Sequence, residues 1–256
     1  MIKIGLKLWS TNFELFSPAV SLYRGGEIDF VELYVVPSSF HKDTLGILRS
    51  VPITLHAPHE KHGLDLGKKS DTNEQLIGEA IFFAEYFRSS KIVVHPGYSH
   101  KDSVLSYNIK SLLDSRFLLE NMPVIADEAL GGGKLLGATL GHIREMTSLG
   151  NKLCLDFGHA VKSAVSQGWD YKRFISGMIS DFTPEYFHIS DGALDNPYDE
   201  HLDLGRGGVD LSWVKGQLDA LGALSKRDLW VVFETPKAQG GLENDVKNIR
   251  YFRGIV

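Results

Sequence analysis

The chain has 256 residues, of which 43% are hydrophobic and 23% charged, and this composition is typical of a globular protein with a full buried core. Its net charge of -5 and its pI near 6.1 exclude a generally basic surface of the kind that binds nucleic acid or anionic membranes. Bound metal ions would add local positive charge that this count omits. The length suits one large α/β barrel or two small domains.

Cysteine content and apolar runs indicate the cellular compartment. The one cysteine, Cys154, lies in the apolar run KLCLDF, where a small buried strand residue is expected. A chain without an internal disulfide suits a reducing cytoplasm. The start, MIKIGLKLWS, is too short and interrupted for a signal peptide, and no apolar run approaches the roughly 20 residues of a membrane span. We therefore expect a cytoplasmic protein with no membrane partner.

Apolar, β-rich segments alternate with segments of helical periodicity along the whole chain. The expected strands are Ile2–Leu8, Asp29–Val35, Val51–His56, Lys91–His95, Phe117–Asn121, Lys152–Asp156, Tyr186–Ile189 and Leu229–Glu234. The expected helices are Thr72–Phe87, Lys101–Leu113, His142–Leu149, Tyr171–Ser180, Leu211–Leu221 and Leu242–Phe252. The clearest of these is Thr72–Phe87, whose start Asp71 or Thr72 is expected to cap.

Repeated strand–helix alternation implies parallel pairing with right-handed crossovers. Eight such repeats in about 250 residues match the usual size of a (β/α)8 TIM barrel, here a single domain over residues 1–256. A doubly wound open sheet is the runner-up. The motif GxGxxG does not follow the first strand and GxxxxGK[ST] does not occur, so two common nucleotide-binding motifs are missing.

Nine potential metal ligands stand at or near the ends of these strands, where a barrel gathers its active-site residues. Histidines and carboxylates without thiolates suit zinc, manganese or iron. Nine ligands are too many for one ion, but they suffice for two or three ions that share bridging carboxylates. They are His56, His95, Glu120, Asp156, His159, His188, Asp199, His201 and Glu234.

Some of these positions are more informative than others. A single strand-end histidine is more often a hydrogen-bonded packing residue than a ligand. Glu120 and Glu234 end apolar runs, where an unpaired carboxylate would be costly to desolvate. The D-x-H pair Asp199 and His201 places both side chains on one face if the loop is extended. The ordered set therefore predicts a metal site more strongly than any member of it.

The ordered motifs resemble those of the xylose isomerase-like TIM barrels, a superfamily that includes endonuclease IV, and the resemblance covers nearly the whole chain. Endonuclease IV enzymes cleave DNA at abasic sites with three zinc ions, and all nine positions that would hold those ions carry a suitable ligand here. The matching segments are His56-Ala57-Pro58-His59, His95-Pro96-Gly97, Glu120-Asn121, Asp156-Phe157-Gly158-His159-Ala160, His188-Ile189-Ser190-Asp191, Asp199-Glu200-His201, Leu204–Gly207 and Glu234-Thr235.

The sequence also departs from the DNA enzymes. His59 stands where they present an aromatic residue, and Lys7 stands where they usually have histidine on the first strand. The basic segment that they insert beside the lesion after strand two is missing, and VELY at that strand is closer to the sugar isomerase and epimerase branch. That branch typically holds one metal ion with residues matching Glu120, Asp156, His188 and Glu234.

Two enzymatic hypotheses follow from the resemblance, and a metal-storing or degenerate scaffold ranks third. The first is a phosphoester hydrolase with up to three Zn²⁺ ions, in which Glu120 bridges two ions and the substrate is abasic DNA or a phosphorylated small molecule. The second is a sugar or sugar-phosphate isomerase or epimerase with one Mn²⁺ or similar ion, in which Glu120 and Glu234 exchange protons and Lys7 holds a phosphate or enediolate. The expected substrate-binding residues are His59, Trp9 and Arg206.

Overall fold

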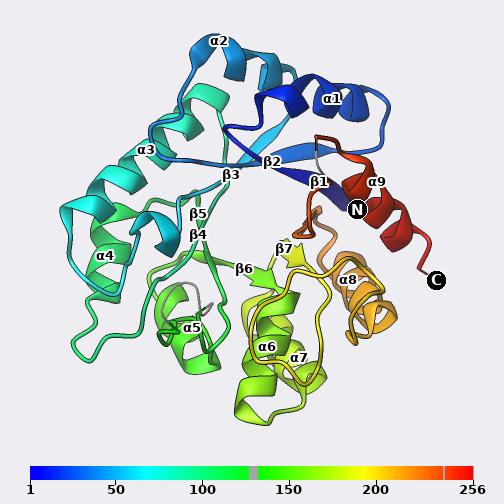
Figure 1. The fold of residues 1–256 in the computed structure, drawn as a ribbon. Coiled ribbons are helices and arrows are strands. Elements are labelled where there is room, and N and C mark those ends of the chain that lie inside the picture. Colours follow the sequence, from blue (N-terminus) through cyan, green and yellow to red (C-terminus); the bar gives the residue numbers. More distant parts are fainter. Residues whose placement is uncertain (127–131, 239, 256) are drawn as a thin grey trace.

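The computed structural model describes residues 1–126, 132–238 and 240–255, and it has the expected (β/α)8 architecture (Figure 1). Parallel strands close in chain order, and β1 pairs with both β2 and β8. The strands are β1 (Ile2–Trp9), β2 (Phe30–Tyr34), β3 (Ile53–His56), β4 (Ile92–Val94), β5 (Phe117–Glu120), β6 (Lys152–Asp156), β7 (Tyr186–Ile189) and β8 (Leu229–Phe233). All eight expected strands are therefore confirmed to within two residues at each end.

Helices form an outer ring around the strands (Figure 1). They are α1 (Phe13–Arg24), α2 (Lys42–Leu45), α3 (Asp71–Phe87), α4 (Leu105–Leu112), α5 (Leu140–Thr147), α6 (Phe157–Gln167), α7 (Tyr171–Phe182), α8 (Leu211–Ser225) and α9 (Glu243–Arg253), with short 3-10 turns η1 (Gly46–Ser50) and η2 (Glu60–His62). The cap of α3 is Ser70, whose side chain accepts from the backbone N–H of Asn73, so the expectation of Asp71 or Thr72 is wrong by one or two positions.

The barrel interior is filled in layers because alternate residues of each strand point inward. One buried cluster takes a single residue from each of six strands: Phe30, Val93, Leu118, Cys154, Tyr186 and Val232. Two positions further along the chain from each of these residues stand Glu32, His95, Glu120, Asp156, His188 and Glu234, on the strands or directly after them. An apolar layer therefore forms the floor on which a polar layer of ligand-type side chains rests.

Gly5 completes that floor on β1. A Cβ atom at this position would lie 2.4 Å from ring atoms of Phe30, which is far inside van der Waals contact. The missing side chain lets the Phe30 ring fill the barrel axis, and the next inward residue of β1 is Lys7, at the level of the ligands. The expected small buried strand residue, Cys154, belongs to the same floor.

A second and larger apolar core lies between the strands and the ring of helices. It takes the alternate, outward residues of the strands, such as Leu119, Leu155 and Phe187, and packs them against helix residues such as Ala80 and Val161. Within the ranges 1–126, 132–238 and 240–255, no helix has the length and hydropathy to cross a lipid bilayer.

Candidate metal centre

The predicted ligands converge at one end of the barrel because parallel strands all finish on the same side. His56, Glu120 and Asp156 are the last residues of β3, β5 and β6. His188 lies within β7, and His95 and Glu234 directly follow β4 and β8. His159 lies in the first turn of α6, while Asp199 and His201 lie in the loop between β7 and α8. Strand pairing sets Asp156 beside His188.

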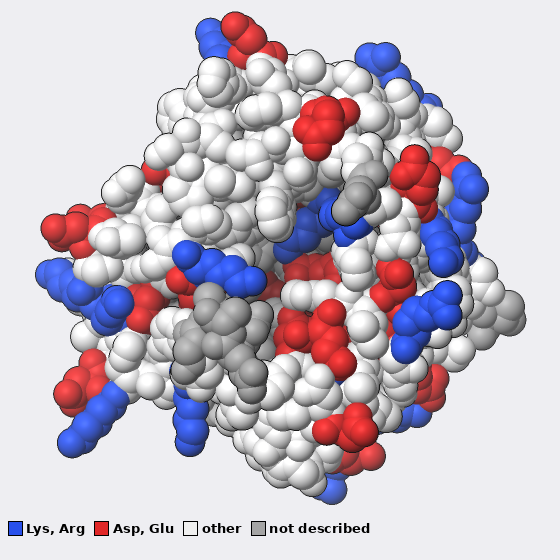
Figure 2. Space-filling model, viewed as in Figure 1, with Lys and Arg blue, Asp and Glu red and all other residues white. Residues whose placement is uncertain are grey.

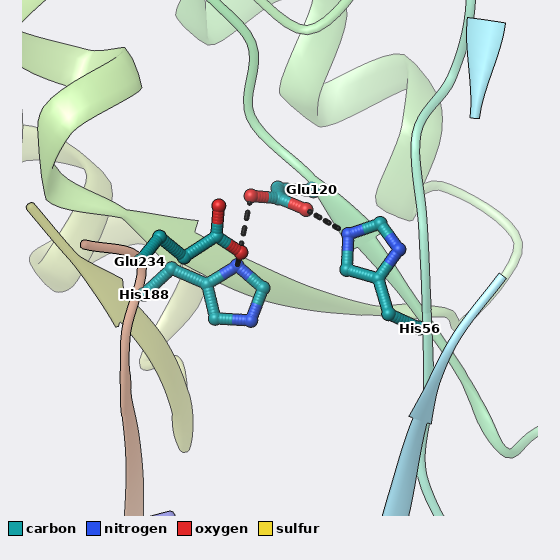
Figure 3. A group of neighbouring side chains, drawn as sticks. All are labelled: His56, Glu120, His188 and Glu234. Atoms are coloured by element: carbon teal, nitrogen blue, oxygen red, sulfur yellow. Dashed lines mark hydrogen bonds and ion pairs between the residues drawn. The ribbon is translucent and has the colours of Figure 1, made fainter. Parts of the chain in front are cut away.

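Glu120 lies at the centre of the cluster and presents its two carboxylate oxygens to different histidines (Figure 3). Its Oε2 atom is 3.3 Å from Nε2 of His56 and 3.3 Å from Nε2 of His95. Its Oε1 atom is 3.0 Å from Nδ1 of His188 and 3.4 Å from Nδ1 of His159. A carboxylate held in this way is suited to bridge two ions, one on each oxygen.

Glu234 links this centre to an outer set of ligands. Its Oε1 atom is 2.9 Å from Nδ1 of His188, and its Oε2 atom is 3.1 Å from Nε2 of His201. Asp199 Oδ2 lies 2.9 Å from Nε2 of His201 and 3.4 Å from Nε2 of His159. Three groups of ligand atoms each fit within 4.8 Å: His56, Glu120, His188 and Glu234; His159, Asp199 and His201; and Glu120, Asp156 and His159.

Four of the histidines are oriented by a hydrogen bond from one ring nitrogen to a group beside the cluster. The bonds are His56 Nδ1 to the Ala57 carbonyl (2.8 Å), His95 Nδ1 to Glu60 Oε2 (2.9 Å), His159 Nδ1 to the Asn121 carbonyl (2.9 Å) and His188 Nε2 to Glu32 Oε2 (2.9 Å). Such bonds fix the ring and its tautomer, leaving the other nitrogen to bind a metal ion. The cluster is therefore built to hold ions with its rings already oriented.

Asp156 gives an independent test of whether metal ions fit. The side chain has no exposed surface, and its Oδ1 atom accepts from the backbone N–H of His159 at 2.6 Å. Its Oδ2 atom is buried and, within the described part of the chain, has no hydrogen-bond partner. Burial raises the pKa of this carboxyl to about 6, because an ionised buried carboxylate is costly unless a cation neutralises it, and the ring nitrogens paired with Oδ2, Nδ1 of His159 and of His188, are 3.9 and 4.0 Å away. A metal ion beside Asp156 removes that cost, so the residues present fit the ions that their chemistry implies.

Without metal, protonated histidines neutralise the carboxylates of the cluster. Burial alone would lower the pKa of His95, but Glu60 and Glu120 outweigh this effect and raise the pKa to about 10. Burial likewise opposes protonation of His159, yet Asp156 and Asp199 raise its pKa to about 9. The carboxylates thus stabilise imidazolium cations at positions where metal ions would bind.

Zinc loading should therefore release protons. At pH 8 the metal-free protein still carries protons on His95 and His159, and these must leave before either ring can bind zinc, so we expect at least about two protons per chain. The affinity for zinc should fall as the pH is lowered, because protons compete for the same nitrogens. Calorimetric zinc titrations in two buffers of different ionisation enthalpy measure the count. A value of zero would show that these histidines do not bind the metal.

A cavity of about 580 Å³ opens above the ligands, and among the predicted substrate-binding residues it is lined by Trp9 and His59. Figure 2 shows carboxylate side chains gathered in the hollow of this face, with Lys and Arg side chains beside them. Lys7, Lys61 and Lys237 are the lysines that line it. Trp9 is 55% exposed, so part of this aromatic side chain is open to a ligand in the cavity. Arg206 is exposed and does not line the cavity.

Lys7 reaches the ligand layer from β1. Its Nζ atom forms ion pairs with Glu234 Oε1 and, at 3.3 Å, with Glu32 Oε1. Burial would lower the pKa of Lys7, but Glu234 and Glu32 outweigh it and keep the pKa well above its ordinary value. Lys7 is thus a fixed cation beside one of the bridging carboxylates.

Sequence reasoning did not identify two supporting carboxylates, Glu32 and Glu60. Glu32 is fully buried, bonds to His188 and accepts from the hydroxyl of Tyr186 at 2.8 Å. Burial opposes its ionisation, but His188 and Lys7 lower its pKa to about 2. A signal for Glu32 exists, because a charged residue interrupts the apolar strand FVELY at an inward position.

Several solved structures share this fold. They include a D-tagatose 3-epimerase-like protein (19% identity, 99% of this chain and 98% of that chain, TM-score 0.69) and endonuclease IV from Thermus thermophilus (20%, 98% and 97%, 0.64). Another is the IOLI protein with a bound zinc atom (14%, 98% and 96%, 0.59). No protein-family model and no curated protein sequence matches the chain. At these identities the likeness shows the (β/α)8 barrel fold.

Proposed function

We propose that this chain is a metal-dependent phosphoester hydrolase of the xylose isomerase-like superfamily, with a multinuclear, zinc-binding centre. The observation that carries the proposal is the pair of ligand groups that share no residue. One group surrounds Glu120, and the other consists of His159, Asp199 and His201. An isomerase that uses one ion has no need of the second group, whereas hydrolases use neighbouring ions to stabilise both the attacking and the leaving oxygen.

Different ligands of the centre would hold different ions. His56 and His95 would hold one ion with Glu120 Oε2, since both rings face that oxygen. Asp156, His188 and Glu234 would serve the neighbouring ion. When bound, the ions supply Lewis-acid stabilisation of charge on the phosphate and lower the pKa of water towards neutrality. Glu120, anchored between two histidine pairs, would orient the attacking water, and Lys7 would add positive charge at the same level.

The cavity supports a small phosphorylated substrate in preference to duplex DNA. Its volume is that of ordinary small-molecule sites, and an exposed aromatic, Trp9, lies on its rim. Phosphate-backbone binding depends on several Lys or Arg contacts, yet the chain carries a net charge of -5 and Arg206 lies outside the cavity lining. Abasic DNA is the substrate class that the likeness to endonuclease IV suggests, so a duplex with an abasic site is the second substrate to test.

One observation favours an isomerase or epimerase as the second candidate. Lys7 is ion-paired with Glu234, so a cation stands in the ligand layer where this mechanism would use it to hold a phosphate or an enediolate. Glu120 and Glu234 both contact Nδ1 of His188, which places two carboxylates around one ligand of a single-ion site. The D-tagatose 3-epimerase-like neighbour is consistent with this second candidate.

The deciding experiment compares reactions on one preparation. The protein is stripped with chelator, reloaded with Zn²⁺ or Mn²⁺, and incubated with bis(4-nitrophenyl) phosphate, a duplex with one abasic site, and ketohexoses. We expect metal-dependent cleavage of the phosphodiester and no interconversion of the sugars. Cleavage without nicking of the duplex would assign a small-molecule substrate. Sugar epimerisation without any phosphoester cleavage would overturn the proposal in favour of the second candidate.

A further inference from the structure

The loop between β7 and α8 carries two of the predicted ligands, Asp199 and His201, and the second of them has an unfavourable backbone conformation. His201 has a φ of 48°, in the left-handed region that residues other than glycine seldom adopt. A residue held there costs on the order of 1–3 kcal/mol and persists only when its surroundings enforce it. Asp199 and His201 therefore depend on contacts that hold this loop in place.

The base of the loop is held by Asp191. Its Oδ1 atom accepts from the backbone N–H groups of Gly192 (2.8 Å) and Val209 (3.1 Å), and its Oδ2 atom accepts from Gly205 (2.9 Å). Backbone hydrogen bonds between Asp191 and Leu202 add to this closure. These contacts tie the two ends of the loop together, but they do not include the segment 193–200.

That segment is held by Lys162 of α6, a lysine with only 1% of its surface exposed. Its Nζ atom donates to the carbonyls of Ala193 (2.8 Å) and Asn196 (3.1 Å) and to Glu200 Oε2 (2.5 Å). The three donors of an ammonium group thus meet three acceptors, which is what a buried charge requires. Glu200 Oε2 also accepts from the backbone N–H of Ala193 at 2.8 Å. The Lys162–Glu200 pair closes the loop tip.

Glu200 lies between Asp199 and His201, and Lys162 lies one helical turn after His159. Residues three apart share a face of a helix, so α6 presents a ligand and the loop-holding lysine on the same side. One helix therefore positions all three members of the outer group: His159 directly, and Asp199 and His201 through the Lys162–Glu200 pair.

We propose that Lys162 is a positioning residue that assembles the ion site formed by His159, Asp199 and His201, and that this site gains and loses its ion separately from the site around Glu120. The inference rests on the multinuclear centre of the proposed function. The inner ligands stand on strand ends of the closed barrel, whereas two of the three outer ligands depend on one buried ion pair. The number of bound ions is thus set by the loop.

The test is a competitive zinc titration of the full chain against a chromophoric chelator, for the natural sequence and Lys162→Met. We expect the variant to bind its weakest zinc ion about tenfold to a hundredfold less tightly, the range seen when residues that orient ligands are removed. The remaining zinc affinities should change little, because Asp191 still closes the loop base. The unfolding temperature of the metal-free protein should fall, because removing one partner of a buried ion pair is destabilising. A merely structural role would instead weaken every site.

Glu200→Gln is the second variant, since the side chain is 25% exposed and glutamine has the same shape as glutamate. It should weaken the same zinc ion. The matched control is Lys172→Met, which removes another lysine–carboxylate pair, Lys172–Asp210, also at 2.5 Å but on an exposed surface. It should leave every zinc affinity unchanged. If the natural sequence binds several ions and Lys162→Met binds them all as tightly, the role of Lys162 is disproved while the proposed function stands. A natural sequence that binds one ion would disprove both.

Discussion

The variant Glu120→Gln is expected to lose phosphoesterase activity by about a thousandfold or more while the fold survives, because metal-supplied stabilisation of the transition state is worth several kcal/mol. Each oxygen of Glu120 faces two histidines, so a single carboxylate serves both inner ion positions. An amide of the same shape leaves one oxygen to accept and puts a donor where the other stood. It cannot bridge two cations.

The measurements are kcat/KM for bis(4-nitrophenyl) phosphate, zinc content, and the unfolding temperature. We expect the zinc content to fall together with the activity, and the unfolding temperature of the metal-free protein to stay within a few degrees, since glutamine fills the same volume. Glu74→Gln, on the exposed first turn of α3, is the control for removing one negative charge. Full activity of Glu120→Gln would show that the bridging assignment is wrong.

Much of the fold was predictable because each strand carries its own signal. Apolar runs of four to eight residues bounded by turns mark strands, and the closed barrel follows from their regular alternation with helices. Three of the described helices were not predicted. α1 contains Pro18, which usually argues against a helix, and α6 starts at Phe157, immediately after β6, with Gly158 in its first turn. α2 is only four residues long.

Five of the nine ligands were predictable for a related reason: each stands two positions after a residue of the apolar floor, as in Leu118 and Glu120 or Tyr186 and His188. Two of the supporting residues, Lys162 and Glu60, lack such a local mark. Lys162 resembles an ordinary helix lysine in the sequence, and its acceptors lie 31 to 38 positions further along the chain. Glu60 contacts His95 across 35 positions. Only the barrel brings these pairs together, so their roles depend on tertiary structure.

Counting and removing the metal should separate the two candidate functions. Protein purified without chelator is expected to contain about three zinc equivalents, two at the inner positions that Glu120 serves and one at His159, Asp199 and His201, whereas an isomerase site would hold about one ion. Chelation should abolish the activity without unfolding the chain, because the histidines and carboxylates of the empty centre pair with one another, as His188 does with Glu120 and Glu234.

Returning zinc should restore the activity and raise the unfolding temperature, because ions that bind only the folded chain stabilise it by about 2.7 kcal/mol per site at a free concentration of 100 Kd. Mn²⁺ serves as the comparison ion, measured by elemental analysis and thermal unfolding on the same stripped sample. About one equivalent of either ion, with full activity and no further rise in unfolding temperature, would contradict a multinuclear centre. Three equivalents would require His159, Asp199 and His201 as ligands, since the inner residues provide only the two ion positions that Glu120 serves.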